Sequence, residues 1–427
     1  MRPVLFTPVP AELAWSSLGF SAAWSGFGRC HTAVLSSGPL RASEDNTPLS
    51  NFDVIFASLA WELEVPTMAK ALLDSGIEPD RVLRPENQPL IVAGGPLTRS
   101  NPDLLAACAD AVFVGDADRA FDKIYSALAG AEGRLDALRR LALIPGCWVP
   151  AVHGIEFEVP IVVHRPKKTD LPICSPWPVR ANNFGDAFLV EVGRGCPRLC
   201  AFCVATGEGA PARFATKEKI LEVIPKQARR VGLLGAAVSD HPQLVAIVRE
   251  LLARDIQVTL GSIRADRARS ELVSLLASSG LKTLTVAADG TSQHIRDLIR
   301  KNISANDLLN AAMAARGAGI HRLRLYVMTG LPDEGDGDID EFCELCEEIS
   351  SVVRLSISIS PFVPKRFTAL ADAPFLPVNE QKRRISRIKR SIGKRVQIRA
   401  TSPREAEYEY WLSHVRGEEA RKALTRP

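Results

Sequence analysis

Three cysteines, Cys196, Cys200 and Cys203, lie within eight residues of one another. Thiolates at spacings of four and three residues can wrap one [4Fe–4S] cluster from a single loop, ligating three irons and leaving the fourth open. Gly193 and Gly195 would let the backbone pass close to such a cluster. A zinc site and a ferredoxin-like electron carrier are the alternatives, but each would want a fourth ligand, and none lies close by in the sequence.

The cysteine loop follows the first strand of a region in which strands and helices alternate. Six such units predict a partial TIM-type barrel over residues 186–365, with its chemistry at the carboxyl ends of the strands. The predicted strands are Phe188–Val192, Val231–Ala236, Gln257–Leu260, Thr283–Val286, Arg322–Val327 and Leu355–Ser360. The predicted helices are Lys217–Arg229, Gln243–Arg254, Arg267–Ser278, Ser292–Arg300, Ala305–Ala315 and Ile339–Val352.

A second α/β pattern occupies residues 1–130. Short apolar runs alternate there with helix-like stretches, which is typical of a doubly wound, flavodoxin-like domain with buried parallel strands. Gly94, Gly95 and Gly115 follow two of these runs, at carboxyl strand ends where open α/β sheets bind ligands. The predicted strands are Val4–Phe6, Thr32–Leu35, Val54–Leu59, Leu90–Val92 and Ala111–Val114, and the predicted helices are Leu63–Asp74 and Pro102–Ala107.

The other segments predict a linker and a basic extension. Residues 131–185 are rich in proline and contain the alternating stretch Val152–His164, which indicates a small β element. Residues 366–427 form a C-terminal extension with eight Lys or Arg residues in Lys382–Arg395. Isoleucines at helical spacing in that stretch indicate an amphipathic helix with a solvated charged face.

Composition limits the class of protein. The nine cysteines are odd in number and scattered, which does not fit a disulfide framework, and the net charge of +4 does not by itself indicate nucleic-acid binding. No apolar stretch is long enough to span a bilayer, and the first residues lack the layout of a signal peptide. We therefore expect a cytoplasmic protein without a membrane span. Cys343 and Cys346 form a C-x2-C pair, which we expect to pack one face of a helix.

The C-x3-C-x2-C loop after a barrel strand resembles the radical SAM superfamily, in the subgroup with an N-terminal cobalamin-binding-type domain. Leu298–Ile303 and Ile359–Lys365 are the most specific further segments of this resemblance. The resemblance implies that Cys196, Cys200 and Cys203 hold a [4Fe–4S] cluster that reductively cleaves S-adenosylmethionine (SAM) to a 5′-deoxyadenosyl radical. It also implies an external electron donor of the flavodoxin or ferredoxin type.

The resemblance also assigns contacts with SAM to the ends of successive barrel strands. Relatives usually have Glu or Gln where this chain has Asp289, so the contact with the ribose is less well matched. Helix capping by Ser239, Asp240 or Asp289, and pairing of Arg264 with Asp266, are the alternative interpretations. The implied contacts are Gly235, Ser239 and Asp240 at the amino end of the methionine, Arg264 at its carboxylate, Asp289 at the ribose and Met328 beside the adenine.

The sequence of the first domain does not decide whether this domain binds cobalamin. The loop after its first strand, Thr7–Pro10, lacks the D-x-H-x-x-G motif of histidine-ligated cobalamin, and His31 lacks the companion residues of that motif. Cobalamin could bind without a protein ligand, with Gly94, Gly95 and Gly115 lining its edge. The alternative is a degenerate domain that contributes packing or substrate access.

Three hypotheses of function follow. The first is a cobalamin-dependent methyltransferase acting on a small metabolite. The second is a cobalamin-free radical SAM catalyst of rearrangement or ring formation. The third is a factor that modifies RNA or protein and docks through Lys382–Arg395. We disfavour nucleic acid as a partner because aromatic residues are not interleaved with the basic ones.

Overall fold

The computed structural model describes residues 1–118, 120–157, 171–206, 212–393 and 396–425. The chain forms two compact units, one of Met1–Asp186 with Trp411–Pro427 and the other of Ala187–Tyr410. Most of the predicted hairpin Val152–His164 lies outside the described residues, while Val152 and His153 belong to the short helix α7 (Pro150–His153). No helix among the described residues is both long and apolar enough to cross a membrane.

The first unit is built around a six-stranded sheet in the order β2-β1-β3-β4-β5-β6. All neighbouring strands are parallel except β6, which runs antiparallel to β5. This order confirms the flavodoxin-like α/β fold. The strands are β1 (Pro3–Thr7), β2 (His31–Val34), β3 (Val54–Ser58), β4 (Leu90–Gly94), β5 (Ala111–Phe113) and β6 (Cys147–Trp148).

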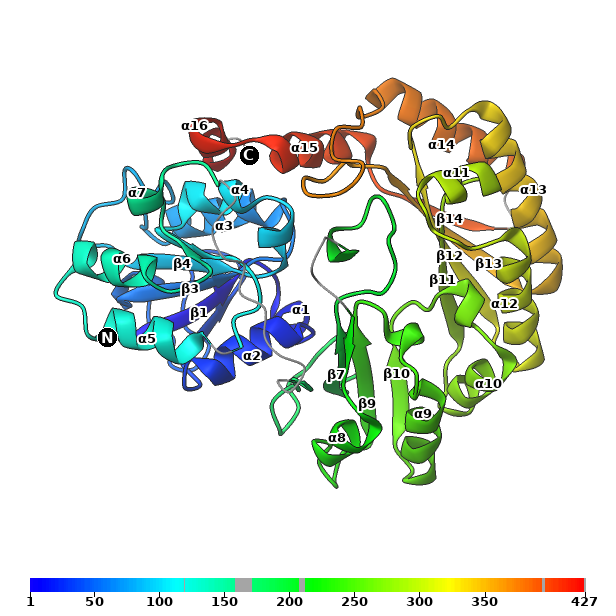
Figure 1. Ribbon diagram of the computed structural model, residues 1–427, viewed down its shortest axis with the longest axis horizontal. Helices are drawn as coiled ribbons and strands as arrows, with labels where there is room; N and C mark the ends of the chain where they lie inside the picture. The colour runs from blue at the N-terminus through cyan, green and yellow to red at the C-terminus, as the bar shows by residue number, and fades with distance from the viewer. Residues whose placement is uncertain (119, 158–170, 207–211, 394–395, 426–427) are drawn as a thin grey trace. The chain divides into compact units, whose positions relative to one another are not determined.

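Helices cover both faces of this sheet (Figure 1). On one face, α2 (Leu18–Gly26), α5 (Phe121–Ala129) and α6 (Arg134–Ala142) contribute apolar side chains to a core that includes strand residues such as Phe56 and Val92. The other helices of the unit are α1 (Ala11–Ala14), α3 (Glu64–Asp74), α4 (Pro102–Cys108) and α16 (Gly417–Ala420). Elements α6, β6 and α7 thus fall in residues that the sequence analysis assigned to a linker.

The end of the chain completes the first unit. The buried side chain of Asn101 donates hydrogen bonds to the carbonyl oxygens of Leu412, at 2.8 Å, and of Val415, at 3.0 Å. Arg421 donates to Asp80 at 2.8 Å. These contacts make Trp411–Pro427 part of the fold of this unit.

The second unit is a partial barrel made of two four-stranded sheets, β10-β9-β7-β8 and β11-β12-β13-β14. A parallel bridge between Ile263 and Val286, with a 3.0 Å hydrogen bond from Ile263 N to Thr285 O, links the two sheets. The strands are β7 (Phe188–Arg194), β8 (Arg213–Phe214), β9 (Arg230–Gly235), β10 (Gln257–Leu260), β11 (Thr283–Asp289), β12 (Arg322–Thr329), β13 (Arg354–Pro361) and β14 (Gln397–Ala400).

All six predicted barrel strands are present, and helices pack on their outer side (Figure 1). The predicted helix Lys217–Arg229 is wrong in its second half: α8 is only Lys217–Glu222, because Pro225 cannot continue a helix. The other helices are α9 (Leu244–Ala253), α10 (Ser270–Ser278), α11 (Gln293–Leu298), α12 (Ala305–Gly317), α13 (Asp336–Val352) and α14 (Val378–Ile392). Helix α15 (Pro403–His414) begins in this unit, and its residues from Trp411 onward belong to the first unit.

The basic stretch forms most of α14, and its isoleucines are buried as an amphipathic helix requires. Its arginines, however, are partly engaged by the acidic start of α13. Arg383 pairs with Asp336 at 2.7 Å, and Arg387 pairs with Asp340 at the same distance. Arg384 is largely buried and pairs with Glu334 at 2.5 Å. The stretch is therefore not a simple solvated basic face.

Candidate active site

The cysteine loop leaves the end of β7 and is held by backbone hydrogen bonds to later segments of the second unit. Ala201 N donates to Ile299 O at 2.9 Å, and Leu370 N donates to Ala201 O at 3.2 Å. Cys200 is buried, whereas Cys196 and Cys203 are partly exposed. Burial raises the pKa of the Cys200 and Cys203 thiols, and the neighbouring cysteines raise both further. Binding iron would therefore release protons from these thiols.

The three cysteines border one cavity of about 430 Å³ at the carboxyl ends of the barrel strands. Parallel strands bring their carboxyl ends to one edge, which is why residues far apart in the sequence meet there. The cavity is lined by five of the six residues that the resemblance assigns to SAM: Gly235, Ser239, Asp240, Arg264 and Asp289.

Met328, the sixth, is not on the cavity wall. It packs with Phe202 against the apolar cluster of Ile299 and Phe362. Tyr326, two residues earlier on β12, lines the cavity instead. The two side chains share one face of the strand, so the alternation of β12 did not distinguish between them.

The donor set suits a [4Fe–4S] cluster with one open iron. Among the described lining residues, no fourth cysteine and no histidine borders the cavity. Among the described residues, no three His, Cys, Asp or Glu side chains converge as they would around a single metal ion. A cluster does not require that convergence, because each thiolate binds a different iron.

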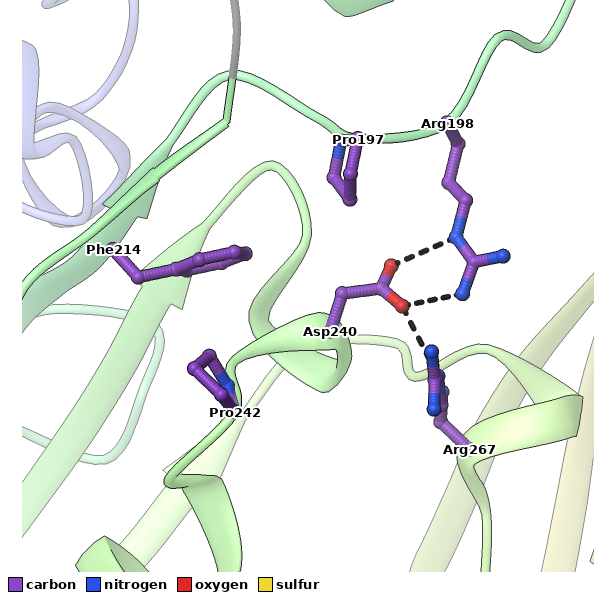
Figure 2. A pocket seen from close by; sticks show the side chains of 6 residues that line it. All are labelled: Pro197, Arg198, Phe214, Asp240, Pro242 and Arg267. Atoms are coloured by element: carbon purple, nitrogen blue, oxygen red, sulfur yellow. Dashed lines mark hydrogen bonds and ion pairs between the residues drawn. The ribbon is translucent and has the colours of Figure 1, made fainter.

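Asp240 is held by two arginines in an adjoining cavity of about 410 Å³ (Figure 2). Arg198, from the cysteine loop, donates to both carboxylate oxygens, at 2.5 and 3.2 Å. Arg267 Nε donates to Asp240 Oδ1 at 3.1 Å. Burial opposes ionisation of Asp240, but these hydrogen bonds and charges outweigh it and hold the pKa of the carboxyl below its ordinary value. Asp240 thus ties the cysteine loop to the end of β9.

Arg264 and Ser239 are also committed to protein partners. Arg264 donates to Asp266 at 2.9 Å and to the carbonyl oxygen of Lys301 at 3.0 Å, which confirms the alternative of a pairing with Asp266. The backbone N–H of Arg264 donates to Ser239 Oγ at 3.2 Å. The capping alternatives are wrong, because Gln243 and Ser292 occupy the N-cap positions of α9 and α11.

Lys301 is a cavity residue to which the sequence analysis gave no role. Its ammonium donates to the carboxylate of Asp289, and both side chains are mostly buried. Lys301 also opposes, by its charge, the rise that burial causes in the pKa of Cys200. It lies in the segment Leu298–Ile303, whose resemblance to relatives was the available signal.

The glycines predicted to line a cobalamin edge lie at the carboxyl edge of the first sheet. Gly95 has a φ of 107°, and a Cβ there would lie 2.4 Å from Leu59 O, so packing alone requires glycine. Gly94 ends β4, and Gly115 follows β5 with a φ of 109°. His31 begins β2, at the opposite edge, and its Nε2 lies 3.1 Å from Asp45.

Cys343 and Cys346, the C-x2-C pair, are both buried on α13. Burial raises the pKa of both thiols. They pack on one face of the helix, as predicted.

Comparisons with known proteins agree with this architecture. The profile described as "Radical SAM superfamily" matches residues 190–346, and the one described as "Radical SAM proteins, N-terminal" matches residues 31–150. An uncharacterised protein of Methanocaldococcus jannaschii is 28% identical over 76% of this chain and 69% of its own length. An uncharacterised methyltransferase of Pyrococcus horikoshii is 22% identical over 61% of this chain and 58% of its own length.

Among solved structures, the cobalamin-dependent S-adenosylmethionine radical enzyme OxsB, with aqua-cobalamin and S-adenosylmethionine bound, is similar in fold. Its TM-score is 0.55 at 14% identity, and the match covers 84% of this chain and 53% of that chain. This chain therefore spans about half the length of that enzyme. With the cysteine loop at the mouth of a partial barrel and profiles matching both units, the chain belongs to the radical SAM superfamily, whose cofactors are a [4Fe–4S] cluster and SAM.

Proposed function

We propose that Cys196, Cys200 and Cys203 hold the [4Fe–4S] cluster and that the cavity beside them receives SAM. The observation that carries this proposal is that all three thiols border the same cavity as the ends of β9, β10 and β11. When bound, the cluster supplies the electron that breaks the sulfonium C–S bond of SAM. An external flavodoxin or ferredoxin would supply that electron to the cluster.

The side chains of this site would bind SAM and orient it. Gly235 has no side chain to block the methionine, and Ser239 Oγ lies at the same edge. Arg264 has one guanidinium nitrogen on Asp266 and another on the carbonyl of Lys301, so it would act mainly by fixing the cavity wall. Tyr326 would present its ring and hydroxyl to the adenosine or to the substrate.

We infer that the reaction is a group transfer to a small metabolite, with methyl as the group. The name of the Pyrococcus relative and the cobalamin-dependent enzyme of similar fold support this inference. A cobalamin-free reaction is the second candidate. His31 begins β2, at the edge of the sheet opposite to Gly94 and Gly115, so it is not placed to ligate the cobalt of a cobalamin bound at those glycines. Docking of RNA is less favoured, because Arg383, Arg384 and Arg387 already pair with acidic side chains. A cytoplasmic location stays a prediction.

The test is anaerobic reconstitution of the full chain with iron and sulfide, followed by metal analysis and an assay for 5′-deoxyadenosine. We expect about four irons per chain, and SAM cleavage that depends on a reductant. A variant with Cys196, Cys200 and Cys203 replaced by alanine should lose both. Cys174→Ser, which changes a partly exposed cysteine of the first unit, should lose neither.

A full complement of iron without SAM cleavage would refute the proposal. Cobalt retained stoichiometrically after growth with cobalamin would favour the methyltransferase, whereas SAM cleavage without bound cobalt would favour the second candidate.

A further inference from the structure

The concave face of the second half of the barrel is unusually polar for a parallel sheet. Strands of such sheets are normally apolar on both faces, because helices or a core cover each side. On β12, Leu323, Leu325 and Val327 are buried, while the alternating residues of the other face are partly or fully exposed. Met328 is the apolar residue of that other face on β12, and its polar residues are Arg322, Arg324 and Tyr326 on β12, Ser358 and Ser360 on β13, and Gln397 and Arg399 on β14.

The register places these polar residues beside the SAM cavity. Tyr326, which lines the cavity, lies opposite Ser358, and Ser358 lies opposite Arg399. Two strand spacings therefore separate the backbones of Tyr326 and Arg399, or about 10 Å. Arg324 precedes Tyr326 by two residues on the same face, about 7 Å along the strand. Neither arginine lines the cavity itself, but both lie on the sheet face that continues from the cavity at Tyr326.

Both arginines have no counter-ion within the part of the chain that the structure describes. The guanidinium of neither Arg324 nor Arg399 forms a hydrogen bond or an ion pair there, although both backbones pair within the sheet. The described strands β12, β13 and β14 carry no Asp or Glu on any face. Arginines of the cavity wall behave differently, since Arg198 and Arg264 are each paired with a carboxylate. A pair of uncompensated guanidiniums on a strand surface is suited to a bound anion.

We propose that the substrate is a small organic anion whose carboxylate or phosphate group is bound by Arg399 and Arg324. A guanidinium offers parallel N–H donors that match the oxygens of either group. Ser358 lies between Arg399 and the cavity-lining Tyr326 in the register of the sheet, and the hydroxyls of these two residues would hydrogen-bond the part of the substrate nearest SAM. This inference rests on the proposed function, because it takes the cavity to be the SAM site.

The test measures anion binding to the reconstituted full chain saturated with S-adenosylhomocysteine, by titration calorimetry at low ionic strength. Citrate and pyrophosphate are the probes for carboxylate and phosphate recognition. We expect one of the two to bind, and Arg399→Gln and Arg324→Gln each to weaken it about 10- to 100-fold, the usual effect of losing a charge-assisted hydrogen bond. Arg254→Gln, on the exposed surface of the segment after α9, removes the same charge elsewhere and should change nothing.

The outcomes separate the two proposals. Whichever probe depends on Arg399 identifies the substrate's acidic group. If neither probe binds, or if both bind equally to all three variants, the anion site is refuted, and the proposed function stands as long as S-adenosylhomocysteine binds. If the wild type fails to bind S-adenosylhomocysteine, the proposed function fails. Retention of S-adenosylhomocysteine affinity by Arg399→Gln and Arg324→Gln shows that these variants are folded.

Discussion

The carboxylate of Asp240 joins the cysteine loop to the barrel, and replacing it with asparagine should loosen that loop. Its side chain is 3% exposed, against 24% for Arg198 and 42% for Arg267. Removing one partner of a fully buried pair costs about 3–5 kcal/mol. Because Arg198 is partly solvated and the amide keeps one acceptor, we expect about 2 kcal/mol from that contact. The more exposed Arg267 should add less than about 1 kcal/mol.

The expected total is therefore about 2–3 kcal/mol for Asp240→Asn. The same loss should let the loop open more often, so the reconstituted variant should release iron to a chelator at least about tenfold faster than wild type. The assay pairs urea unfolding of the full chain with the decay of cluster absorbance under chelator. Glu250→Gln, which neutralises an exposed i,i+4 partner of Arg254, is the matched control. A variant that matches this control in both measurements would refute the role given to Asp240.

Three further predictions concern neighbouring residues. Burial lowers the pKa of His241 below its ordinary 6.5, so near that pH the unfolded state binds more protons than the folded state. The free energy of unfolding should therefore fall as the pH drops through 6.5, and urea unfolding of His241→Gln should lack this component. Lys301→Met should destabilise the chain by about 2 kcal/mol by leaving Asp289 without its partner, and adding Asp289→Asn should recover part of the loss in a double-mutant cycle. Gly235→Ala should cost about 1–3 kcal/mol in thermal unfolding because its Cβ would lie 2.5 Å from Gly193 O, whereas Gly261→Ala, where the Cβ meets nothing within 4 Å, should be tolerated. Equal stability of the two alanine variants would contradict the last prediction.

Apolar periodicity located the strands of both units, because each buried strand is a short run of branched residues between turns. It missed the two-residue strands β6 and β8, which are too short to show a period, and it missed β14, where Ile398 is the only large apolar residue of Gln397–Ala400. That strand exists because its backbone pairs with β13, a non-local contact that no local pattern records. The length of α8 was predicted wrongly because the helical pattern was read past Pro225.

The cysteines could be recognised from spacing alone, since one loop carries all three. The rest of the cavity comes from separate strand ends, so its residues could be proposed, but their partners could not, apart from the pairing of Arg264 with the nearby Asp266. The carboxylate of Asp240 could accept hydrogen bonds from a ligand or from protein side chains, and only the positions of Arg198 and Arg267 show that it accepts them from the protein. Lys301 had no spacing signal, because its partner Asp289 lies on the other side of α11 in the sequence.

Because Asn101 forms hydrogen bonds with Leu412 and Val415, the first unit can complete its folding only late in synthesis. A ribosome makes the flavodoxin-like sheet first and its final segment last, after the whole barrel has been synthesised. Until Trp411–Pro427 emerges, the amide of Asn101 lacks the carbonyl groups that it binds in the finished protein. Removing residues from Trp411 onward should therefore destabilise the N-terminal unit. In a nascent chain stalled before residue 411, that unit should be more sensitive to proteases than in the full chain.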